Sequence, residues 1–269
     1  MSGTDAPVPG PDEGSRGLDT SRPSIARVYD YWLGGKDNFA VDRKVAAGML
    51  EQDPDLATRV RDNRRFVTKA AGLASERGIA QFIDLGAGLP TRPSVHEAAR
   101  AGQPQARVVY VDNDPMVVSH ARALLATGQG LAAMAGDLRD PAAVLGDPVL
   151  GSVIDLAQPA CVILAAVAHF LPAARAAELA AQYMAVLAPG SWLAVSFAHF
   201  ADEELLARLY AMHTSAPFQN HGPAQLSAFL GGLDVIPPGI AEVRRWLSGI
   251  AGTPAGKSAY MLCGVGVKR

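Results

Sequence analysis

The sequence predicts an α/β protein, with a mostly parallel, doubly wound sheet preceded by an N-terminal helical cap. Three observations lead to this prediction. After Gly78, short apolar segments alternate with helical ones, which is typical of strands joined by helices on both faces of a sheet. Before Gly78, apolar and aromatic residues follow helical spacing alone. Near the end of the chain, two apolar segments follow each other without a convincing helix between them, so we expect an antiparallel pair at one sheet edge.

Composition divides the chain into three segments. Residues 1–20 are rich in Pro, Gly, Ser and Asp and lack periodicity, so a disordered tail is expected there. Residues 21–78 form the cap, with helices expected over 23–33, 42–50 and 55–77. Gly34 and Gly35 end the first of these helices, and Gly78 suits the C-cap of the third. Residues 79–269 form the sheet domain.

The sheet domain begins with five predicted strands. They are expected over 81–85, 107–111, 131–135, 160–168 and 192–197, with helices over 93–101, 115–127 and 172–187. The run 160–168 is too apolar for an edge strand and is expected at the centre of the sheet. Two more helices are expected between residues 201 and 230, strands over 233–236 and 259–267, and at most a short turn of helix over 242–247.

Charge and cysteine content argue against several classes of protein. The 269 residues carry 24 Lys plus Arg against 26 Asp plus Glu, without the basic surplus of a dedicated nucleic-acid-binding domain. Cys161 and Cys263 make no metal-ligand spacing, so neither a structural zinc nor a disulfide scaffold is expected. The longest apolar run is shorter than the roughly 18 residues of a membrane span, and the N-terminus has no signal-peptide pattern. We expect a soluble cytoplasmic protein with no membrane or metal partner.

A glycine-rich turn after the first predicted strand is the strongest chemical signal. The segment 84–88, DLGAG, lets the backbone approach a ligand where a Cβ would clash, and a following helix would offer free N–H groups. The dinucleotide fingerprint needs a third glycine at position 91, where this chain has Thr91. Asp84 stands where that fingerprint is apolar, and its carboxylate can accept hydrogen bonds from an ammonium group.

Acids also end the second and third predicted strands. Asp112 stands 28 residues after Asp84 and can accept both hydroxyls of a ribose. Asp137 stands 25 residues after Asp112 and can accept a hydrogen bond from an adenine amino group. Three successive strand-end carboxylates would line one crevice at the carboxyl edge of the sheet. Each acid also has a structural alternative, since Asp112 could cap the helix at Pro115 and Asp137 the turn before Pro141.

Together these motifs resemble those of class I S-adenosylmethionine-dependent methyltransferases, over residues 79–269. A narrower resemblance is to a bacterial family known as S-adenosyl methyltransferases. It is carried by ARVYDYWLGGKDNF at 26–39, by Asn63-Arg64, by GLPT at 88–91 and by VDNDP at 111–115. Pro90 replaces a third glycine of the general motif and removes one N–H from the turn. The narrower family shares this feature, so we do not interpret it as inactivation.

The resemblance implies a Rossmann-like sheet of seven strands whose last strand is antiparallel. It implies S-adenosyl-L-methionine as the cofactor and S-adenosyl-L-homocysteine as the product. The residues expected to bind the cofactor are Asp84, Gly86, Ala87, Gly88, Asp112, Asn113, Asp137, Leu138, Tyr29, Tyr31 and Gly34.

Four aromatic residues of the N-terminal segment have two interpretations. Tyr29, Tyr31, Trp32 and Phe39 could form a lid that covers the cofactor and excludes water. They could instead form a hydrophobic face that docks the N-terminal helices onto the rest of the protein, and this reading is favoured for Trp32.

Three polar positions are weaker candidates. His169 and His199 follow the fourth and fifth predicted strands and could act as a general base, although packing at the strand ends is favoured for both. Arg64, with Asn63, could reach a carboxylate of the acceptor or the cofactor, or form a salt bridge on a helix surface.

The predicted function is methyl transfer to a small-molecule acceptor held by residues 21–78 and 199–221. No Asn-Pro-Pro-Tyr run follows the fourth strand, no Pro-Cys pair suits a nucleophile, and no acid and histidine cluster suits a catalytic metal. The mechanism that these observations favour is methyl transfer by proximity, in which the protein aligns the acceptor with the methyl group. Two alternatives stay open: an NAD-dependent oxidoreductase, and a cofactor-binding protein of methyltransferase fold without catalysis. The accepting atom and the oligomeric state also stay open.

Overall fold

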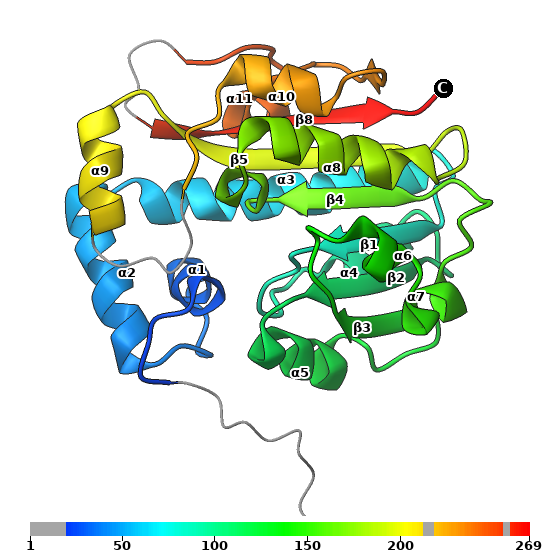
Figure 1. The fold of residues 1–269 in the computed structure, drawn as a ribbon, viewed down its shortest axis with the longest axis horizontal. Coiled ribbons are helices and arrows are strands. Elements are labelled where there is room, and N and C mark those ends of the chain that lie inside the picture. Colours follow the sequence, from blue (N-terminus) through cyan, green and yellow to red (C-terminus); the bar gives the residue numbers. More distant parts are fainter. Residues whose placement is uncertain (1–19, 212–217, 255–258) are drawn as a thin grey trace, which may run out of the picture.

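A single mixed sheet forms the centre of the computed structural model, which describes residues 20–211, 218–254 and 259–269 (Figure 1). In the described ranges the strands follow the order β3-β2-β1-β4-β5-β8-β6, and β7 pairs with β8 off this path. Their bounds are β1 (Gln81–Leu85), β2 (Arg107–Asp112), β3 (Leu131–Ala135), β4 (Cys161–Ala165), β5 (Trp192–Phe200), β6 (Asp234–Val235), β7 (Ala241–Glu242) and β8 (Ala259–Val267). The predicted tail lies outside the described residues except for Thr20.

The predicted α/β class is confirmed, with a mostly parallel sheet and antiparallel strands at its C-terminal edge. Strands β1 to β5 pair in parallel, and β8 runs antiparallel to β5 from Trp192↔Val267 to Phe200↔Ala259. The path contains the seven expected strands, and the two-residue β7 was not predicted. The order reverses between β1 and β4, which is where α/β sheets of this kind open a crevice at the carboxyl ends of their strands.

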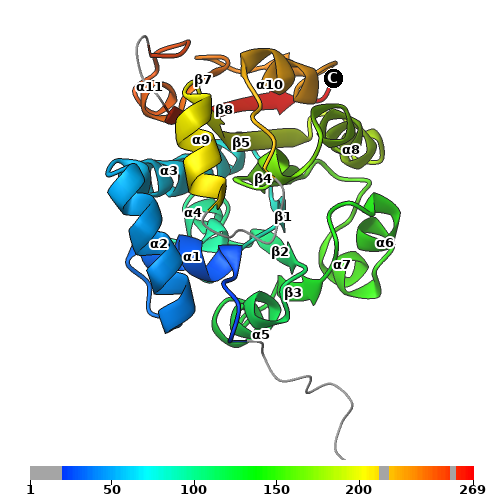
Figure 2. The ribbon, with the colours of Figure 1, turned by 60° about the vertical axis from the view of Figure 1, so that its left-hand side comes forward.

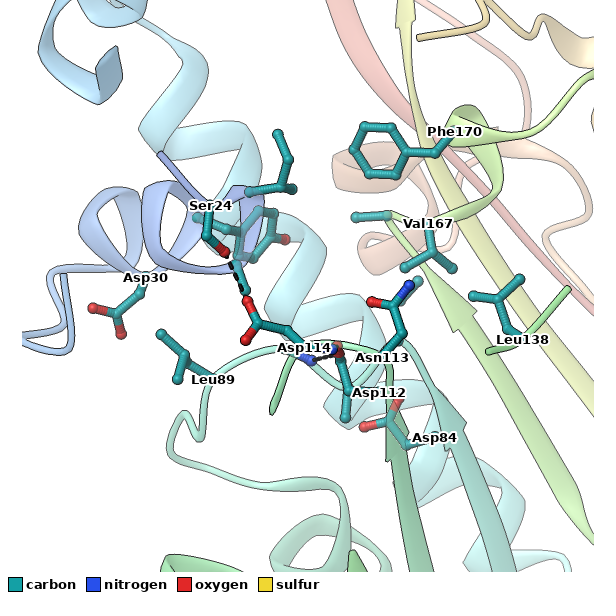
Figure 3. Close-up of a pocket in the computed structure, with 18 of the residues that line it drawn as sticks. Ser24, Asp30, Asp84, Leu89, Asp112, Asn113, Asp114, Leu138, Val167 and Phe170 are labelled. Carbon is teal, nitrogen blue, oxygen red and sulfur yellow. Dashed lines mark hydrogen bonds between the residues drawn. The ribbon is translucent and has the colours of Figure 1, made fainter. Parts of the chain in front are cut away.

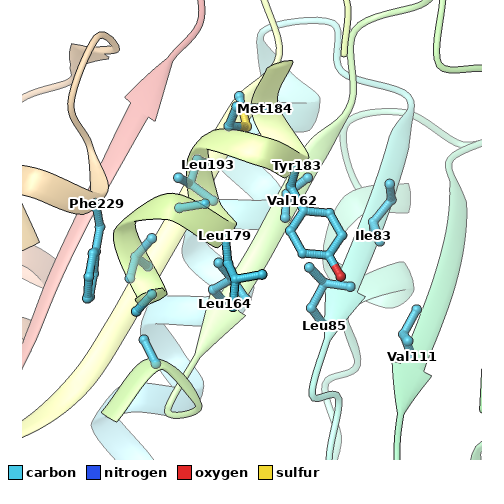
Figure 4. Close-up of a cluster of buried hydrophobic side chains, with 14 of the residues drawn as sticks. Ile83, Leu85, Val111, Val162, Leu164, Leu179, Tyr183, Met184, Leu193 and Phe229 are labelled. Atoms are coloured by element: carbon cyan, nitrogen blue, oxygen red, sulfur yellow. The ribbon is translucent and has the colours of Figure 1, made fainter. Parts of the chain in front are cut away.

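Helices cover both faces of the sheet, because strand residues alternate between the faces. One face buries Ile83 and Leu85 against Leu179 and Tyr183 of α8 (Ala173–Ala185) (Figure 4). Helices α6 (Pro141–Leu145), α7 (Pro148–Val153) and α10 (Pro223–Phe229) add to the same cluster. The other face buries Phe82 against α3 (Leu56–Glu76), α4 (Val95–Arg100), α5 (Pro115–Leu124) and α11 (Val243–Leu247).

The fourth predicted strand was too long, and two short helices were not predicted. The fourth strand ends at Ala165, not at residue 168, because Ala166 adopts a left-handed backbone with φ of 57° and a 3-10 turn, η1 (Ala168–Phe170), follows. Helices α6 and α7 were not predicted. Each begins at a proline after a capping acid, since Asp140 accepts a hydrogen bond from Ala143 N–H and Asp147 from Val149 N–H.

The N-terminal helices lie beyond the carboxyl ends of the parallel strands. In Figure 1 the arrow of β4 points toward them. Helices α1 (Ile25–Leu33) and α2 (Ala40–Gln52) lie near α9 (Glu203–Ala211), as Figure 2 also shows. Their apolar cluster includes Met49, Val60 and Leu209. Helix α3 takes part in both regions, because its later half also packs on the sheet through Phe66. The ring centroid of Phe66 lies 5.0 Å from that of Trp246 in α11.

Two buried carboxylates hold the N-terminal segment together. Asp42 accepts hydrogen bonds from Arg27 Nε at 2.8 Å and from the backbone N–H groups of Ser24 and Phe39. Asp30 accepts from Asn38 Nδ2 at 2.8 Å and from the backbone N–H of Asp37 at 3.0 Å. Much of the motif at 26–39 is therefore explained by the need to fold this loop around its own acids.

Candidate functional site

A cavity of about 650 Å³ opens where the carboxyl ends of the parallel strands face α1 and α3 (Figure 3). The loops after β1, β2, β3 and β4 form one side, and the N-terminal helices form the other. Of the eleven residues expected to bind the cofactor, nine line this cavity: Tyr29, Asp84, Gly86, Ala87, Gly88, Asp112, Asn113, Asp137 and Leu138.

The turn after β1 needs glycine for two separate reasons. Gly86 and Gly88 have φ of 73° and 66°, a backbone region that L side chains rarely adopt. A Cβ on Gly86 would also overlap the side chain of Val167, so the β1 and β4 loops approach each other closely here. Both positions therefore require glycine for the backbone of the turn itself.

The backbone N–H groups of the turn are already used within the protein. Gly86 and Ala87 both donate to the Val111 carbonyl oxygen, at 2.8 and 3.1 Å, and Gly88 donates to Asp112 Oδ2 at 3.0 Å. Helix α4 begins only at Val95, and its N-terminus is closed by a capping box of Ser94 and Glu97. The expectation that a helix directly after the turn offers free N–H groups was therefore wrong. A phosphate-type cradle is not formed at this turn.

The three strand-end acids differ in how their carboxylates are held. Asp84 is 4% exposed, and no described residue donates a hydrogen bond to its carboxylate. Asp112 accepts from Asp114 N–H at 2.9 Å and from Gly88 N–H at 3.0 Å. Asp137 accepts from the backbone N–H and from the guanidinium of Arg139, both at 2.9 Å.

These surroundings move the pKa values in different directions. Burial raises the pKa of Asp84 to about 6, against the opposing effect of Arg64 and with a further rise from Asp112. Burial also raises the pKa of Asp112, while hydrogen bonds from Asp114 and Gly88 lower it. The hydrogen bond from Arg139 lowers the pKa of Asp137. The cavity is thus lined by a partly exposed acid paired with Arg139, which is Asp137, and by a buried acid that receives no hydrogen bond from the described residues, which is Asp84.

Of the two structural alternatives for these acids, the fold contains one. Asp114, not Asp112, caps α5 by accepting from Met116 N–H at 2.9 Å. Asp140, not Asp137, caps α6. Asp137 does cap the turn before Pro141, because its Oδ1 accepts from Arg139 N–H at 2.9 Å. Both Asp112 and Asp137 also line the cavity.

The N-terminal helix brings one of its tyrosines to the cavity and turns the other away. Tyr29 and Leu33, four residues apart and on one helix face, both line it. Tyr31 and Gly34 do not, because Tyr31 lies on another face of α1 and Gly34 is its C-cap, with φ of 82°. The structure does not bring these two predicted residues to the cavity. Trp32 donates to the Ala46 carbonyl at 3.2 Å, as expected for docking.

A chain of hydrogen bonds fixes Tyr29. Its hydroxyl accepts from Asn63 Nδ2 at 3.0 Å and lies 3.5 Å from the Val60 carbonyl oxygen. Asn63 Oδ1 accepts from Ser196 Oγ at 2.6 Å. Burial raises the pKa of the Tyr29 hydroxyl, so it stays protonated near neutral pH.

Neither candidate general base lines the cavity. His169 lies between the rings of Phe170 and Phe218, its Nδ1 accepts from Ala198 N–H at 3.4 Å, and burial lowers its pKa to about 3. His199 donates through Nδ1 to the His221 carbonyl oxygen at 2.8 Å. Both side chains serve the packing of the loops after β4 and β5, the interpretation that the sequence favoured.

Residues 199–221 were predicted to line the acceptor pocket. In the described part of that segment, 199–211 and 218–221, no residue lines the cavity. Residues after β4 take its place. The sequence reasoning missed Ala166, Val167, Phe170 and Leu171 because it read this stretch as strand. The remaining lining residues that it did not single out for the site include Ser24, Leu33, Val67, Leu89, Asp114 and Arg139.

The described ranges lack two features that would point to other kinds of site. No group of three or more His, Cys, Asp or Glu side chains there is arranged to hold a metal ion. No helix in those ranges combines the length and the apolar character that crossing a membrane requires.

Comparisons with known proteins agree with this geometry. A family model described as S-adenosyl methyltransferase matches residues 11–269. A crystal structure from Thermobifida fusca YX, which carries a provisional methyltransferase assignment, is 35% identical, with a TM-score of 0.85 over 96% of this chain and 99% of that one. A DUF574-family protein from Streptomyces avermitilis MA-4680 is 33% identical, with a TM-score of 0.85 over 94% and 100% of the two chains. Among the curated proteins compared, none matches.

Proposed function

The chain belongs to the S-adenosyl methyltransferase family, whose cofactor is S-adenosyl-L-methionine, and we propose that it methylates a small-molecule acceptor. The observation that carries this proposal is the set of three strand-end carboxylates, Asp84, Asp112 and Asp137, in one cavity. A cavity of about 650 Å³ is within the range of small-molecule sites, about 300–1,000 Å³.

Each carboxylate suits a different part of the cofactor. Asp84, buried and without a donor, would accept from the ammonium group of the methionine part. Asp112, held by two backbone N–H groups, would accept from the ribose hydroxyls. Asp137 keeps free acceptor capacity beside Arg139 and would accept from the adenine amino group. Gly86 and Gly88 allow the close approach that this binding needs.

The apolar part of the cavity would hold the acceptor. Tyr29, Leu33 and Val67 come from the N-terminal helices, and Phe170 and Leu171 follow β4. When bound, the cofactor supplies a methyl group on a sulfonium, which is already an activated leaving group. The chain then needs to align the acceptor with the methyl group and to exclude water, and no general base is assigned.

Ligand-dependent thermal unfolding tests the cofactor assignment. A ligand at 100 times its dissociation constant stabilises the native state by about 2.7 kcal/mol, which is roughly 5–10 °C for a domain of this size. We expect this shift with S-adenosylmethionine and S-adenosylhomocysteine, not with NAD, and its loss in Asp112→Ala. Asp147→Ala, which removes a helix cap at a residue that does not line the cavity, should retain the shift. A shift with NAD alone would refute the proposal.

The acceptor class can be tested without knowing the acceptor. The protein is incubated with methyl-tritiated cofactor and, separately, with the low- and high-molecular-weight fractions of a bacterial lysate. Label in the low-molecular-weight fraction, absent with Asp112→Ala, supports a small-molecule acceptor. Label that appears only in protein or nucleic acid would contradict it. No transfer to either fraction, with S-adenosylhomocysteine still bound, would favour a binding protein.

A further inference from the structure

Two oppositely charged side chains that line the cavity keep hydrogen-bonding capacity that the described part of the chain does not use. One is the Asp84 carboxylate, to which no described residue donates. The other is Arg64 Nε, a buried N–H without an acceptor. Buried polar atoms are nearly always hydrogen-bonded, so the unpaired Arg64 Nε–H, together with a buried carboxylate that receives no donor, indicates a ligand that supplies both partners.

The protein fixes the direction of the Arg64 guanidinium. Its Nη2 donates to the carbonyl oxygens of Thr91 and Pro93, at 3.2 and 2.9 Å. The turn between β1 and α4 therefore fixes the Nη2 side of the planar guanidinium group. The Nε–H that remains is a donor whose position is set before any ligand binds.

Arg64 and Asp84 do not satisfy each other. Within the described ranges they make no ion pair, which would require an N···O distance of 4.0 Å or less. Arg64 nevertheless lowers the pKa of Asp84, against the larger, opposite effect of burial. The two charges are thus near enough to interact electrostatically, without an N···O contact of 4.0 Å or less between them. An α-amino acid zwitterion, with an ammonium and a carboxylate on one carbon, has the complementary arrangement.

The turn itself offers little to a carboxylate. The N–H groups of Gly86, Ala87 and Gly88 are taken by Val111 and Asp112. Pro90 has no N–H. A side-chain donor beside the turn would compensate for these losses, and among the cavity-lining residues Arg64 is placed to supply one.

We propose that Arg64 binds the α-carboxylate of the cofactor's methionine part, opposite the ammonium site at Asp84. This inference rests on the proposed function, because it needs S-adenosylmethionine in this cavity. A carboxylate on the acceptor would offer the same chemistry, and the position of Arg64 beside Asp84 assigns the site to the cofactor.

Calorimetric binding of three probes tests the assignment. The probes are S-adenosylhomocysteine, its decarboxylated form, which keeps the amine, and 5′-methylthioadenosine, which lacks both charged groups. The wild type should bind S-adenosylhomocysteine about 10- to 100-fold more tightly than the decarboxylated form. Arg64→Gln should lower the affinity for S-adenosylhomocysteine by the same factor and change the affinities for the other two probes less than about threefold.

Two further variants separate a direct contact from support of the turn. Arg64→Lys keeps the positive charge and loses the planar guanidinium group with its several N–H donors, so an intermediate affinity for S-adenosylhomocysteine is expected. Arg65→Gln, next in sequence and exposed, should bind all three probes as the wild type does. Near-ultraviolet circular dichroism checks that each variant is folded.

The outcomes distinguish the two proposals. Equal weakening of all three probes in Arg64→Gln would mean that Arg64 only supports the turn, and it would overturn the inference. So would equal binding of S-adenosylhomocysteine and its decarboxylated form by the wild type, a comparison that needs no variant. If the wild type does not bind S-adenosylhomocysteine at all, the proposed function itself is refuted, and the inference about Arg64 is refuted with it.

Discussion

Ser24 Oγ donates a hydrogen bond of 2.9 Å to Asp114 Oδ2 and so joins two segments that lie 90 residues apart (Figure 3). Ser24 is the N-cap of α1, and Asp114 caps α5 through its other carboxylate oxygen. Both residues line the cavity, so this contact closes part of its rim. Beside it, Ala26 packs on a small cluster of Leu89, Met116 and Val117. The attachment of the first helix at this point is therefore slight.

Removing the Ser24 hydroxyl should loosen the rim of the cavity. Ser24→Ala loses one hydrogen bond to a carboxylate, so we expect a loss of about 1 kcal/mol in the free energy of unfolding. Dissociation of S-adenosylhomocysteine, followed by stopped-flow displacement, should become several-fold faster. Ser152→Ala, which removes an exposed hydroxyl contact within α7, is the matched control. An unchanged dissociation rate in Ser24→Ala would show that the rim does not limit release.

Asp84 should make the ligand-free protein less stable as pH rises. Burial raises its pKa to about 6, above its usual value near 3.8, so its ionisation opposes folding. The penalty is absent below about pH 4, grows up to about pH 6 and is then complete, at up to about 3 kcal/mol. Asp84→Asn should therefore be more stable than the wild type at pH 7.5 and equal to it near pH 4, as measured by urea unfolding.

The same substitution should weaken ligand binding. The wild-type affinity for S-adenosylhomocysteine is expected to rise between pH 5 and 7, as the Asp84 carboxylate ionises and can accept from an ammonium group. Asp84→Asn should lack this rise, whereas Asp147→Asn should keep it. A variant that gains no stability at pH 7.5 and binds as tightly as the wild type would contradict this view of Asp84.

The two glycines after α1 should respond differently to alanine. Gly34 has φ of 82° with open space around it, so Gly34→Ala should cost about 1–2 kcal/mol for the backbone alone. A Cβ on Gly35 would overlap the Asp30 carboxylate, which holds the following loop. Gly35→Ala should cost more, about 2–4 kcal/mol in chemical denaturation. Combining it with Asp30→Ala should cost less than the sum of the two. An additive result would rule out the overlap.

His169 should prove to be a packing residue. It does not line the cavity, and burial keeps its ring neutral down to a pKa of about 3. His169→Gln should lower the free energy of unfolding by about 1–2 kcal/mol, through lost contacts with Phe170 and Phe218, while S-adenosylhomocysteine binds within about twofold of the wild type. If His169→Gln bound S-adenosylhomocysteine much more weakly while keeping wild-type stability, His169 would have to take part in ligand binding.

Much of the fold could be read from the sequence, because its signals are local. The predicted bounds of β1, β3 and β8 are those of the structure, since each is a short apolar run between turn residues. Helices α6 and α7 were missed because five- and six-residue helices carry too little periodicity. The Asp-Pro pairs that begin them at 140–141 and 147–148 were the available signal.

The sequence by itself determined the parallel sheet, the glycine turn and the acids at the ends of β1, β2 and β3. Strand alternation and turn chemistry act over a few residues, and parallel strands must end at one edge, so these acids had to meet. Only the tertiary structure decided that Tyr29 faces the cavity and Tyr31 does not, and that both candidate histidines are packed away. It also decided that the Arg64 Nε–H and the Asp84 carboxylate lie in one cavity without a hydrogen-bond partner among the described residues. Those relationships depend on how helices pack on the sheet, and packing sums many weak contacts between distant residues.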